Sequence, residues 1–402
     1  MNSCRPGIHR DSCLEWASPL TSLLLQPSDS TPASDTPTRG TPASSDATRG
    51  SRASRSTKPG SSFTALTRTV HEMGLMRRRY GYYWAKLIGA VVLLAVWVAA
   101  FVWIGDSWWQ LASAAVLGVA MTQIAFLGHD AAHRQMFKSG RWNDWVSMII
   151  ANLLVGMSYG WWQSKHTRHH ANPNKEGADP DIALRAVAMT PAMATRHRSP
   201  LLRWLVAHQG WYFFPLLLLE GVSLHTDGLK RVLSRDKVER RWVEIAFLTV
   251  RLGGLAALVL AVLPPGKAAA FLAVQLAVFG LYMGSSFAPN HIGMPLVSPK
   301  LKLDFLRRQV LMSRNITGGR LISLFMGGLN YQVEHHLFPS MARPHLRKIQ
   351  SLVATYCADE GVTYTQTSLW QSYRTVIGYL NTVGLKGKDP FLCPLVAQRR
   401  AL

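Results

Sequence analysis

Three short segments of the chain concentrate side chains that bind transition metals. They supply His129 and His133 in "HDAAH", His166, His169 and His170 in "HTRHH", and Gln332, His335 and His336 in "QVEHH". On a helix, residues three or four positions apart share one face, so each segment would direct its imidazoles towards one point. Imidazole is a ligand for iron, zinc, copper and nickel. The three segments therefore predict one shared metal site, and the ligand type alone leaves the metal open.

Two pairs of adjacent histidines indicate that this site holds two metals. Neighbouring residues on a helix are rotated by about 100° and cannot easily bind the same ion. His169 beside His170, and His335 beside His336, are better suited to two ions a few ångströms apart. His291, in "PNHIGMP" at the end of an apolar run, is a further candidate ligand. Two metals held by neutral imidazoles would form a highly positive site able to bind and reduce O₂.

Other residues close to the histidines are candidates for supporting roles. Ligating imidazoles usually donate their second N–H to a carboxylate or a carbonyl, which fixes their orientation. The candidate partners or weak ligands are Gln332, Asp130, Asn290, Asp179, Asp181 and Glu334, and the candidate walls of a substrate tunnel are Tyr159, Trp161, Trp162 and Tyr331. Helix capping and anchoring at a membrane interface are the alternative roles for these residues.

Several other kinds of metal or cofactor site lack their motifs in this sequence. There is no H-E-x-x-H of a zinc protease, no E-x-x-H pair of a carboxylate di-iron bundle and no G-x-G-x-x-G dinucleotide fingerprint. The four cysteines contain no C-x-x-C and none lies near the histidine segments, so thiolate metal sites and a disulfide framework are both disfavoured. Electrons for such a site must therefore come from another protein.

Long apolar runs predict the elements that position these residues. The chain is 48% apolar and only 16% charged. Largely uncharged runs at 87–104, 107–128, 243–263 and 268–290 are long enough to cross a membrane. The turns within each pair of runs carry only Asp106 and Lys267, whereas basic segments flank the other ends. The positive-inside effect then predicts an integral membrane protein with both termini and the metal site on the cytoplasmic side.

The apolar run at 145–163 is long enough to span, yet the histidines argue against a crossing. A single crossing would separate His129 and His133 from the histidines of "HTRHH" by the thickness of the membrane. We therefore expect this run to lie along the interface or to dip in and return. The predicted fold is an all-α integral membrane protein with four transmembrane helices in two hairpins, interfacial helices and a cytoplasmic helical cap that carries the metal site.

Composition divides the chain into three parts. Residues 1–62 are rich in Ser, Thr, Pro, Ala and Gly and predict a disordered tail, 63–384 form the membrane domain, and 385–402 form a C-terminal tail. The formal charge is +22, but residues 1–62 hold seven basic and five acidic residues and contribute little of it. The excess lies on loops beside apolar runs, which favours contact with anionic lipid headgroups over nucleic acid.

The combined motifs resemble the membrane-bound fatty acid desaturases, and within them the bacterial acyl-CoA or acyl-lipid branch. The resemblance rests on "LGHDAAH", "KHTRHHANPNKEGADPD", "PNHIGMP", "RRQVLMSRNI" and "NYQVEHHLFPSM" and covers roughly residues 63–384. It implies a centre of two Fe ions that uses O₂ and two electrons to form a cis double bond in an acyl-CoA or acyl-lipid substrate. By matching position, the resemblance assigns as iron ligands His129, His133, His166, His169, His170, His335 and His336, with His291 as an eighth.

The electron donor and the exact reaction stay open. Gln332 at the head of the third segment resembles the front-end desaturases, many of which carry a fused cytochrome b5, but no "HPGG" haem motif occurs here. This difference implies an external ferredoxin or flavoprotein reductase as the electron donor and leaves the position of the double bond undetermined. Hydroxylation of an alkane, a fatty acid or a sterol is the alternative reaction at the same site. A membrane metal transporter or sensor is the alternative of another class, although it would need ligands along a path through the spans.

Overall fold

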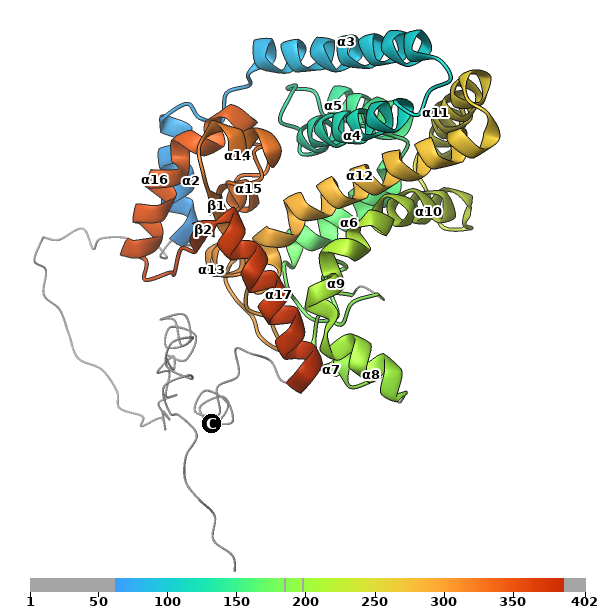
Figure 1. Ribbon diagram of the computed structural model, residues 1–402. Coiled ribbons are helices and arrows are strands. Elements are labelled where there is room, and N and C mark those ends of the chain that lie inside the picture. The colour runs from blue at the N-terminus through green and yellow to red at the C-terminus, as the bar shows by residue number, and fades with distance from the viewer. Residues whose placement is uncertain (1–61, 184–185, 197–198, 387–402) are drawn as a thin grey trace, which may run out of the picture.

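The computed structural model describes residues 62–183, 186–196 and 199–386. The expected tails at 1–62 and 385–402 lie almost entirely outside these ranges. The described chain is mostly helical (Figure 1). Its first half contains the helices α2 (Ser62–Glu72), α3 (Tyr80–Ile104), α4 (Gln110–Ala132), α5 (Gly140–Met148), the π-helix η2 (Ile149–Val155), α6 (Tyr159–Ala171), α7 (Pro191–Ala194) and α8 (Pro200–Ala207).

The second half continues the helical chain and adds one pair of strands. It contains α9 (Gln209–Leu216), the 3₁₀ turn η3 (Leu217–Leu219), α10 (Glu220–Leu233), α11 (Arg241–Val262), α12 (Pro265–His291), α13 (Phe305–Leu311), β1 (Asn315–Thr317), α14 (Arg320–Phe325), α15 (Gln332–Leu337), α16 (Arg343–Asp359), β2 (Gln366–Ser368) and α17 (Leu369–Lys386). The two strands pair in parallel, with Asn315 opposite Gln366. The all-α expectation missed this sheet because three residues are too few to show an alternating pattern.

Four helices in the described ranges are long and apolar enough to cross a membrane, namely α3, α4, α11 and α12. They correspond to the four expected runs, and α3 begins before its run because Tyr80–Lys86 continues the helix. Residues 105–109 join α3 to α4, and Leu263 and Pro264 join α11 to α12. α12 runs through the middle of the molecule and packs against α4 and α10 (Figure 1).

The run at 145–163 is not one straight helix. α5 continues directly into η2, which ends at Val155. The chain then turns at residues 156–158, and α6 begins at Tyr159. Gly156 has φ 97°, and a Cβ there would lie 3.2 Å from Leu252 and 3.3 Å from His225, so glycine suits this turn. η2 packs between α4 and α11, and α6 leads away from the turn towards the histidines.

Buried apolar side chains form three clusters. The largest includes Phe101, Phe126, Phe271 and Phe279 and joins the four long helices. A second cluster joins α2, α13, α15 and α16 into the cap at one end of the molecule (Figure 1). A third joins α9 and α17 with residues 187–194. The histidine segments lie where the first cluster meets the cap.

Candidate metal centre

Four elements bring the eight candidate histidines together. α4 and the residue after it carry His129 and His133, α6 carries His166, His169 and His170, α12 ends at His291, and α15 carries His335 and His336. Hydrogen bonds fix the start of α6 and the end of α12. Ser158 caps α6 by accepting a hydrogen bond from the Trp161 amide at 3.1 Å. The guanidinium of Arg314 donates to the carbonyls of Pro289 and Ile292 and so caps the end of α12.

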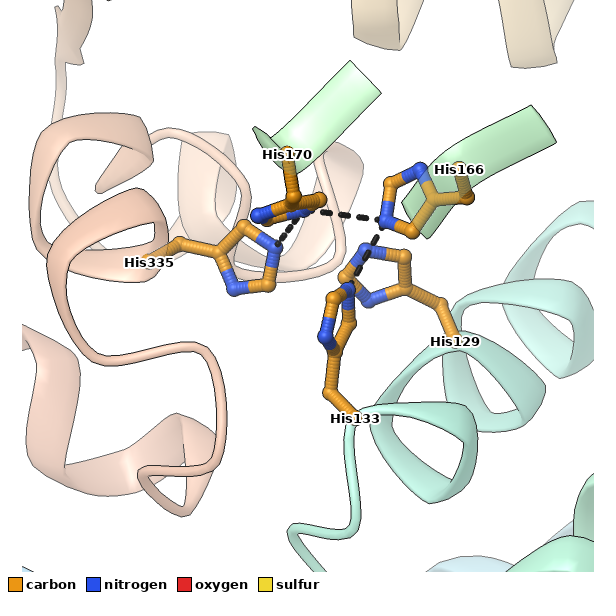
Figure 2. Close-up of side chains that lie close together, drawn as sticks. All are labelled: His129, His133, His166, His170 and His335. Atoms are coloured by element: carbon orange, nitrogen blue, oxygen red, sulfur yellow. Dashed lines mark hydrogen bonds between the residues drawn. The ribbon is translucent and has the colours of Figure 1, made fainter. Parts of the chain in front are cut away.

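Five imidazoles form one group, called here the five-histidine group: His129, His133, His166, His170 and His335. One nitrogen from each lies within 4.8 Å of the others. Nε2 of His166 lies 2.8 Å from Nε2 of His133 and 3.1 Å from Nε2 of His170. Nε2 of His170 lies 3.2 Å from Nε2 of His335, and dashed lines mark these three contacts (Figure 2). Imidazole nitrogens bound at about 2.1 Å to one metal are roughly 3.0–3.4 Å apart. The donor set and its spacing therefore fit a metal ion.

His169, His291 and His336 form a second group, called here the three-histidine group. Nε2 of His169 lies 3.3 Å from Nε2 of His291. The side-chain nitrogen of Gln332 lies 2.9 Å from Nε2 of His291, and its oxygen accepts a hydrogen bond from Asn290 at 3.2 Å. The amide of Gln332 is therefore held against this group.

Each of the two pairs of adjacent histidines is split between the five-histidine group and the three-histidine group. His170 and His335 belong to the five-histidine group, whereas His169 and His336 belong to the three-histidine group. Each pair thus presents one imidazole to each group. This is the arrangement that a helical rotation of about 100° per residue produces.

Burial favours the neutral form of most imidazoles in these groups and leaves their lone pairs available. Desolvation, followed by the neighbouring imidazoles, lowers the pKa of His133, His166, His170, His335 and His336 well below the ordinary value. The Nε2 atoms of His129 and His336 are buried and have no hydrogen-bond partner in the described part of the chain. A buried, unpaired nitrogen is costly, and a metal ion would satisfy it.

Asp179 and Asp181 lie where the sequence analysis expected supporting carboxylates. Nδ1 of His169 lies 3.0 Å from Oδ2 of Asp179 and 3.3 Å from Oδ2 of Asp181. Burial lowers the pKa of His169, but the carboxylates of Asp181 and Asp179 outweigh it and raise the pKa. Both carboxylates therefore orient this imidazole with Nε2 towards His291.

Asp130 and Glu334 have other partners. Asp130 lies 2.7 Å from Nε of Arg343 but 3.8 Å from Nδ1 of His129, so its principal contact is the ion pair. The carboxylate of Glu334 accepts hydrogen bonds from Asn315 at 2.7 Å and from Tyr364 at 2.6 Å, and none from an imidazole. The expected contact between Glu334 and a histidine was therefore wrong.

Two partners of the histidines were missed. Oε1 of Gln309 lies 2.9 Å from Nδ1 of His336, and the backbone carbonyl of Met312 lies 2.9 Å from Nδ1 of His291. Gln309 also donates to the carbonyl of His170 at 2.9 Å and so joins both groups. Both residues belong to "RRQVLMSRNI", and the resemblance of that segment to the desaturase motifs was the available signal.

An apolar cavity of about 220 Å³ adjoins the histidines. Its walls come from α4, η2, α9, α10 and α12, and include Ile150, Val155, Phe213, Leu217, Leu224 and Met283 beside His129, His166, His169 and His291. Tyr159, Trp161 and Trp162 also line it. Tyr331 is not among the residues that line this cavity and packs in the apolar cluster of the cap.

The cavity also contains charged side chains that the sequence analysis did not single out. Lys165 and Glu220 line it together with Asp181. Nζ of Lys165 lies 2.9 Å from Oδ1 of Asp181. Burial lowers the pKa of Lys165, but Asp181 and Glu220 more than offset this and raise it. The cavity thus combines long apolar walls with one polar region.

Comparison with known proteins agrees with this geometry. A family model described as fatty acid desaturase matches residues 106–368. The chain is 29% identical to a Delta(8)-fatty-acid desaturase of Helianthus annuus over 74% of this chain and 68% of that protein. It is 30% identical to an acyl-lipid (9-3)-desaturase of Physcomitrium patens over 72% of this chain and 56% of that protein. It is 28% identical to the Delta(6)-fatty-acid desaturase fat-3 of Caenorhabditis elegans over 78% and 72%, respectively. The matched residues include both histidine groups, and this chain is an oxidoreductase of the fatty acid desaturase family.

Proposed function

We propose that this protein is an O₂-dependent desaturase that introduces a cis double bond into an acyl-CoA or acyl-lipid chain at a centre of two iron ions. The observation that carries the proposal is the position of two imidazole groups beside one apolar cavity. Bound iron, reduced by an external ferredoxin or flavoprotein reductase, would supply the activation of O₂ and the removal of hydrogen from two adjacent methylenes. The overall reaction consumes O₂, two electrons and two protons and yields one double bond and two water molecules.

The five-histidine group would hold one iron and the three-histidine group the other. Neutral imidazoles contribute no charge, and the carboxylates of Asp179 and Asp181 lie behind His169. The charge of the two ions would therefore be largely uncompensated by their ligands, which would favour the reduction of O₂ because reduction adds negative charge to it. The Asp179 carboxylate contacts Nδ1 of His169. Gln309 contacts Nδ1 of His336, and the Met312 carbonyl contacts Nδ1 of His291. These contacts leave Nε2 of each imidazole facing the proposed ions.

The cavity walls would determine which bond is oxidised. A saturated acyl chain offers no polar group near the reacting carbons, so its position depends on shape and apolar contact. Trp161, Trp162 and Tyr159 line the part formed by α6, and Leu224 and Met283 line the part formed by α10 and α12. The buried walls also exclude water from the reacting centre. Two of the relatives are named Delta(8)- and Delta(6)-fatty-acid desaturases, and these names support a double bond near the carboxyl end of the chain.

The four long helices would cross the membrane as two hairpins, within a membrane domain of residues 63–384. Nζ of Lys267 lies 2.7 Å from Oδ1 of Asp106, which brings together the first turn of α12 and the loop that precedes α4. The histidines of α4 and α12 lie at the opposite, C-terminal ends of the same helices. Basic segments on the histidine side support its placement, with both termini, in the cytoplasm.

Expression in a host with defined lipids tests the reaction. We expect a new double bond in the fatty acid methyl esters, identified by mass spectrometry, when a competent reductase is present. A hydroxylated product without a new double bond would replace the desaturase assignment with the hydroxylase alternative. Metal uptake into proteoliposomes without any change in the lipids would favour the transporter.

A further inference from the structure

The helical conformation is interrupted between η2 and α6. This interruption, called here the break, leaves backbone groups without helical partners in the apolar interior. Residues 156–158 are not helical, so the last carbonyls of η2 and the first N–H groups of α6 have no partner within their own helices. The break packs against α11, one of the four helices apolar enough to cross a membrane. Water is scarce at such a place, and each unpaired group would cost several kcal/mol.

Side chains satisfy the first three N–H groups of α6. The amide of Tyr159 donates to Oδ1 of Asn152 at 3.2 Å, and that of Trp161 donates to Oγ of Ser158. The amide of Gly160 donates to Oε1 of Glu244 at 3.1 Å. These contacts replace the missing intrahelical hydrogen bonds.

Glu244 connects this set of contacts to α11. Its Oε2 accepts hydrogen bonds from Ser158 Oγ at 2.7 Å and from Asn152 Nδ2 at 3.0 Å. Glu244 is fully buried. A Cβ at Gly160 would lie 2.6 Å from Oε1 of Glu244, so the absence of a side chain at 160 permits the approach. One carboxylate thus collects three donors from both sides of the break.

Arg251 satisfies the other side of the break. It lies seven residues after Glu244 and therefore on the same face of α11. Its Nε donates to the carbonyl of Leu154, at the end of η2, at 2.8 Å. No carboxylate lies within ion-pair distance of Arg251 among the described residues, so the Leu154 carbonyl is its principal acceptor.

We propose that Glu244 and Arg251 form a clamp on α11 that fixes the direction of α6 and thereby positions His166, His169 and His170 at the metal centre. This inference rests on the proposed function, because it assigns the clamp to that metal site. In the described part of the chain, neither residue contacts a histidine of the two groups by hydrogen bond or ion pair, so both are positioning residues. α6 carries histidines of both groups, and a small change in its direction would therefore disturb both ions.

Metal binding by the purified protein tests the clamp. Co²⁺ affinity and the visible spectrum of bound Co²⁺ are measured for the wild type, Glu244→Gln, Arg251→Gln and Gly160→Ala, alongside the thermal midpoint. We expect Co²⁺ to bind about tenfold more weakly to the three variants, the loss typical of a disturbed ligand environment, with a shifted spectrum. Glu239→Gln, an exposed carboxylate before α11, and Val250→Ala, an exposed residue on α11, are the controls and should match the wild type.

Two outcomes overturn the clamp. Wild-type affinity and spectrum in the variants, even with a lowered thermal midpoint, would show that these residues act only on stability. If Glu244→Gln and Arg251→Gln are not recovered as folded protein, Gly160→Ala decides, because it displaces the carboxylate and keeps every charge. Failure of the wild type itself to bind two metals per chain would instead contradict the proposed function.

Discussion

Lys267 and Asp106 form an ion pair, with Nζ 2.7 Å from Oδ1, between the first turn of α12 and the turn before α4. The indole of Trp108 lies beside the same ammonium, 5.5 Å from ring centre to Nζ. Two turns far apart in sequence therefore meet at one end of the long helices. The histidines lie at the other end of α4 and α12, and this opposition makes the proposed topology testable.

A cysteine at position 267 should react with a membrane-impermeant thiol reagent only from outside the cell. The proposed topology places both short turns there. Lys267→Cys is introduced after the four native cysteines have been replaced, and labelling is compared in intact and opened cells. Loss of an exposed ion pair costs only about 0–1 kcal/mol, so the fold should persist. Lys348→Cys, exposed on α16, is the control and should react only in opened cells. Labelling of position 267 from the cytoplasm alone would contradict the topology.

His170→Ala and His336→Ala should each abolish desaturation and lower the bound iron. The two residues belong to different groups, so each substitution should affect one proposed ion first. Iron per chain is measured by mass spectrometry, and the product by analysis of fatty acid methyl esters. His208→Ala is the control, because the His208 imidazole contacts the Trp204 carbonyl and is exposed. A fully active variant at position 170 or 336 would remove that residue from the proposed ligands.

Asp179→Asn should weaken iron binding by about 10–100-fold, because the amide cannot hold the His169 imidazole as the carboxylate does. The Asp179 carboxylate contacts Nδ1 of His169 at 3.0 Å and also accepts from the Asn174 amide at 2.7 Å. Competition with a chelator measures the affinity. Asp227→Asn, an exposed residue on α10, provides the matched control. Equal affinity for wild type and Asp179→Asn would leave Asp179 with a local structural role.

Leu224→Trp should shift the preference of the enzyme towards shorter or less bulky acyl chains, or abolish turnover. Leu224 is buried and lines the cavity, so an indole would occupy volume that the proposed substrate needs. The profile of fatty acid methyl esters from a mixed-chain host measures this. Leu219→Trp, 63% exposed on the neighbouring turn η3, should leave the profile unchanged. Identical profiles for the two variants would show that the cavity does not hold the chain.

Gln309→Leu should lower iron affinity while retaining the fold, because it keeps the volume near α15 but removes the acceptor at Nδ1 of His336. Gln309→Glu preserves an acceptor and should retain more iron than Gln309→Leu. Iron content after dialysis against a chelator provides the comparison. If both variants hold iron as the wild type does, the contact between Gln309 and His336 has no part in metal binding.

The sequence predicted the four long helices and the meeting of eight histidines because both signals are local. The length of an apolar run can be read directly from the sequence, and spacings of three and four residues place side chains on one helical face. The run at 145–163 was also expected to lie along the interface or to dip in and return, since His129 and His166 cannot share a site across a membrane. Each of these inferences needed only the order of residues along the chain.

The partners of the histidines depend on contacts between distant segments and could be predicted only in part. Asp179 follows His169 closely in sequence and was found, whereas Gln309 and the Met312 carbonyl approach from another segment. Nearness in sequence was also a poor guide to which side chains contact the histidines, because adjacent residues on a helix point in different directions. Glu334 adjoins His335, yet its carboxylate faces Tyr364 and Asn315.

In the proposed topology, the turn at Gly156 also determines how many times the chain changes sides. Four crossings are an even number, so the segments before α3 and after α12 would lie on the same side of a membrane. A straight helix through 145–163 would make the number odd, reverse the direction of α11 and α12, and leave His291 and His335 on the side opposite His129. One reversal in the backbone thus decides where the entire second half of the protein lies.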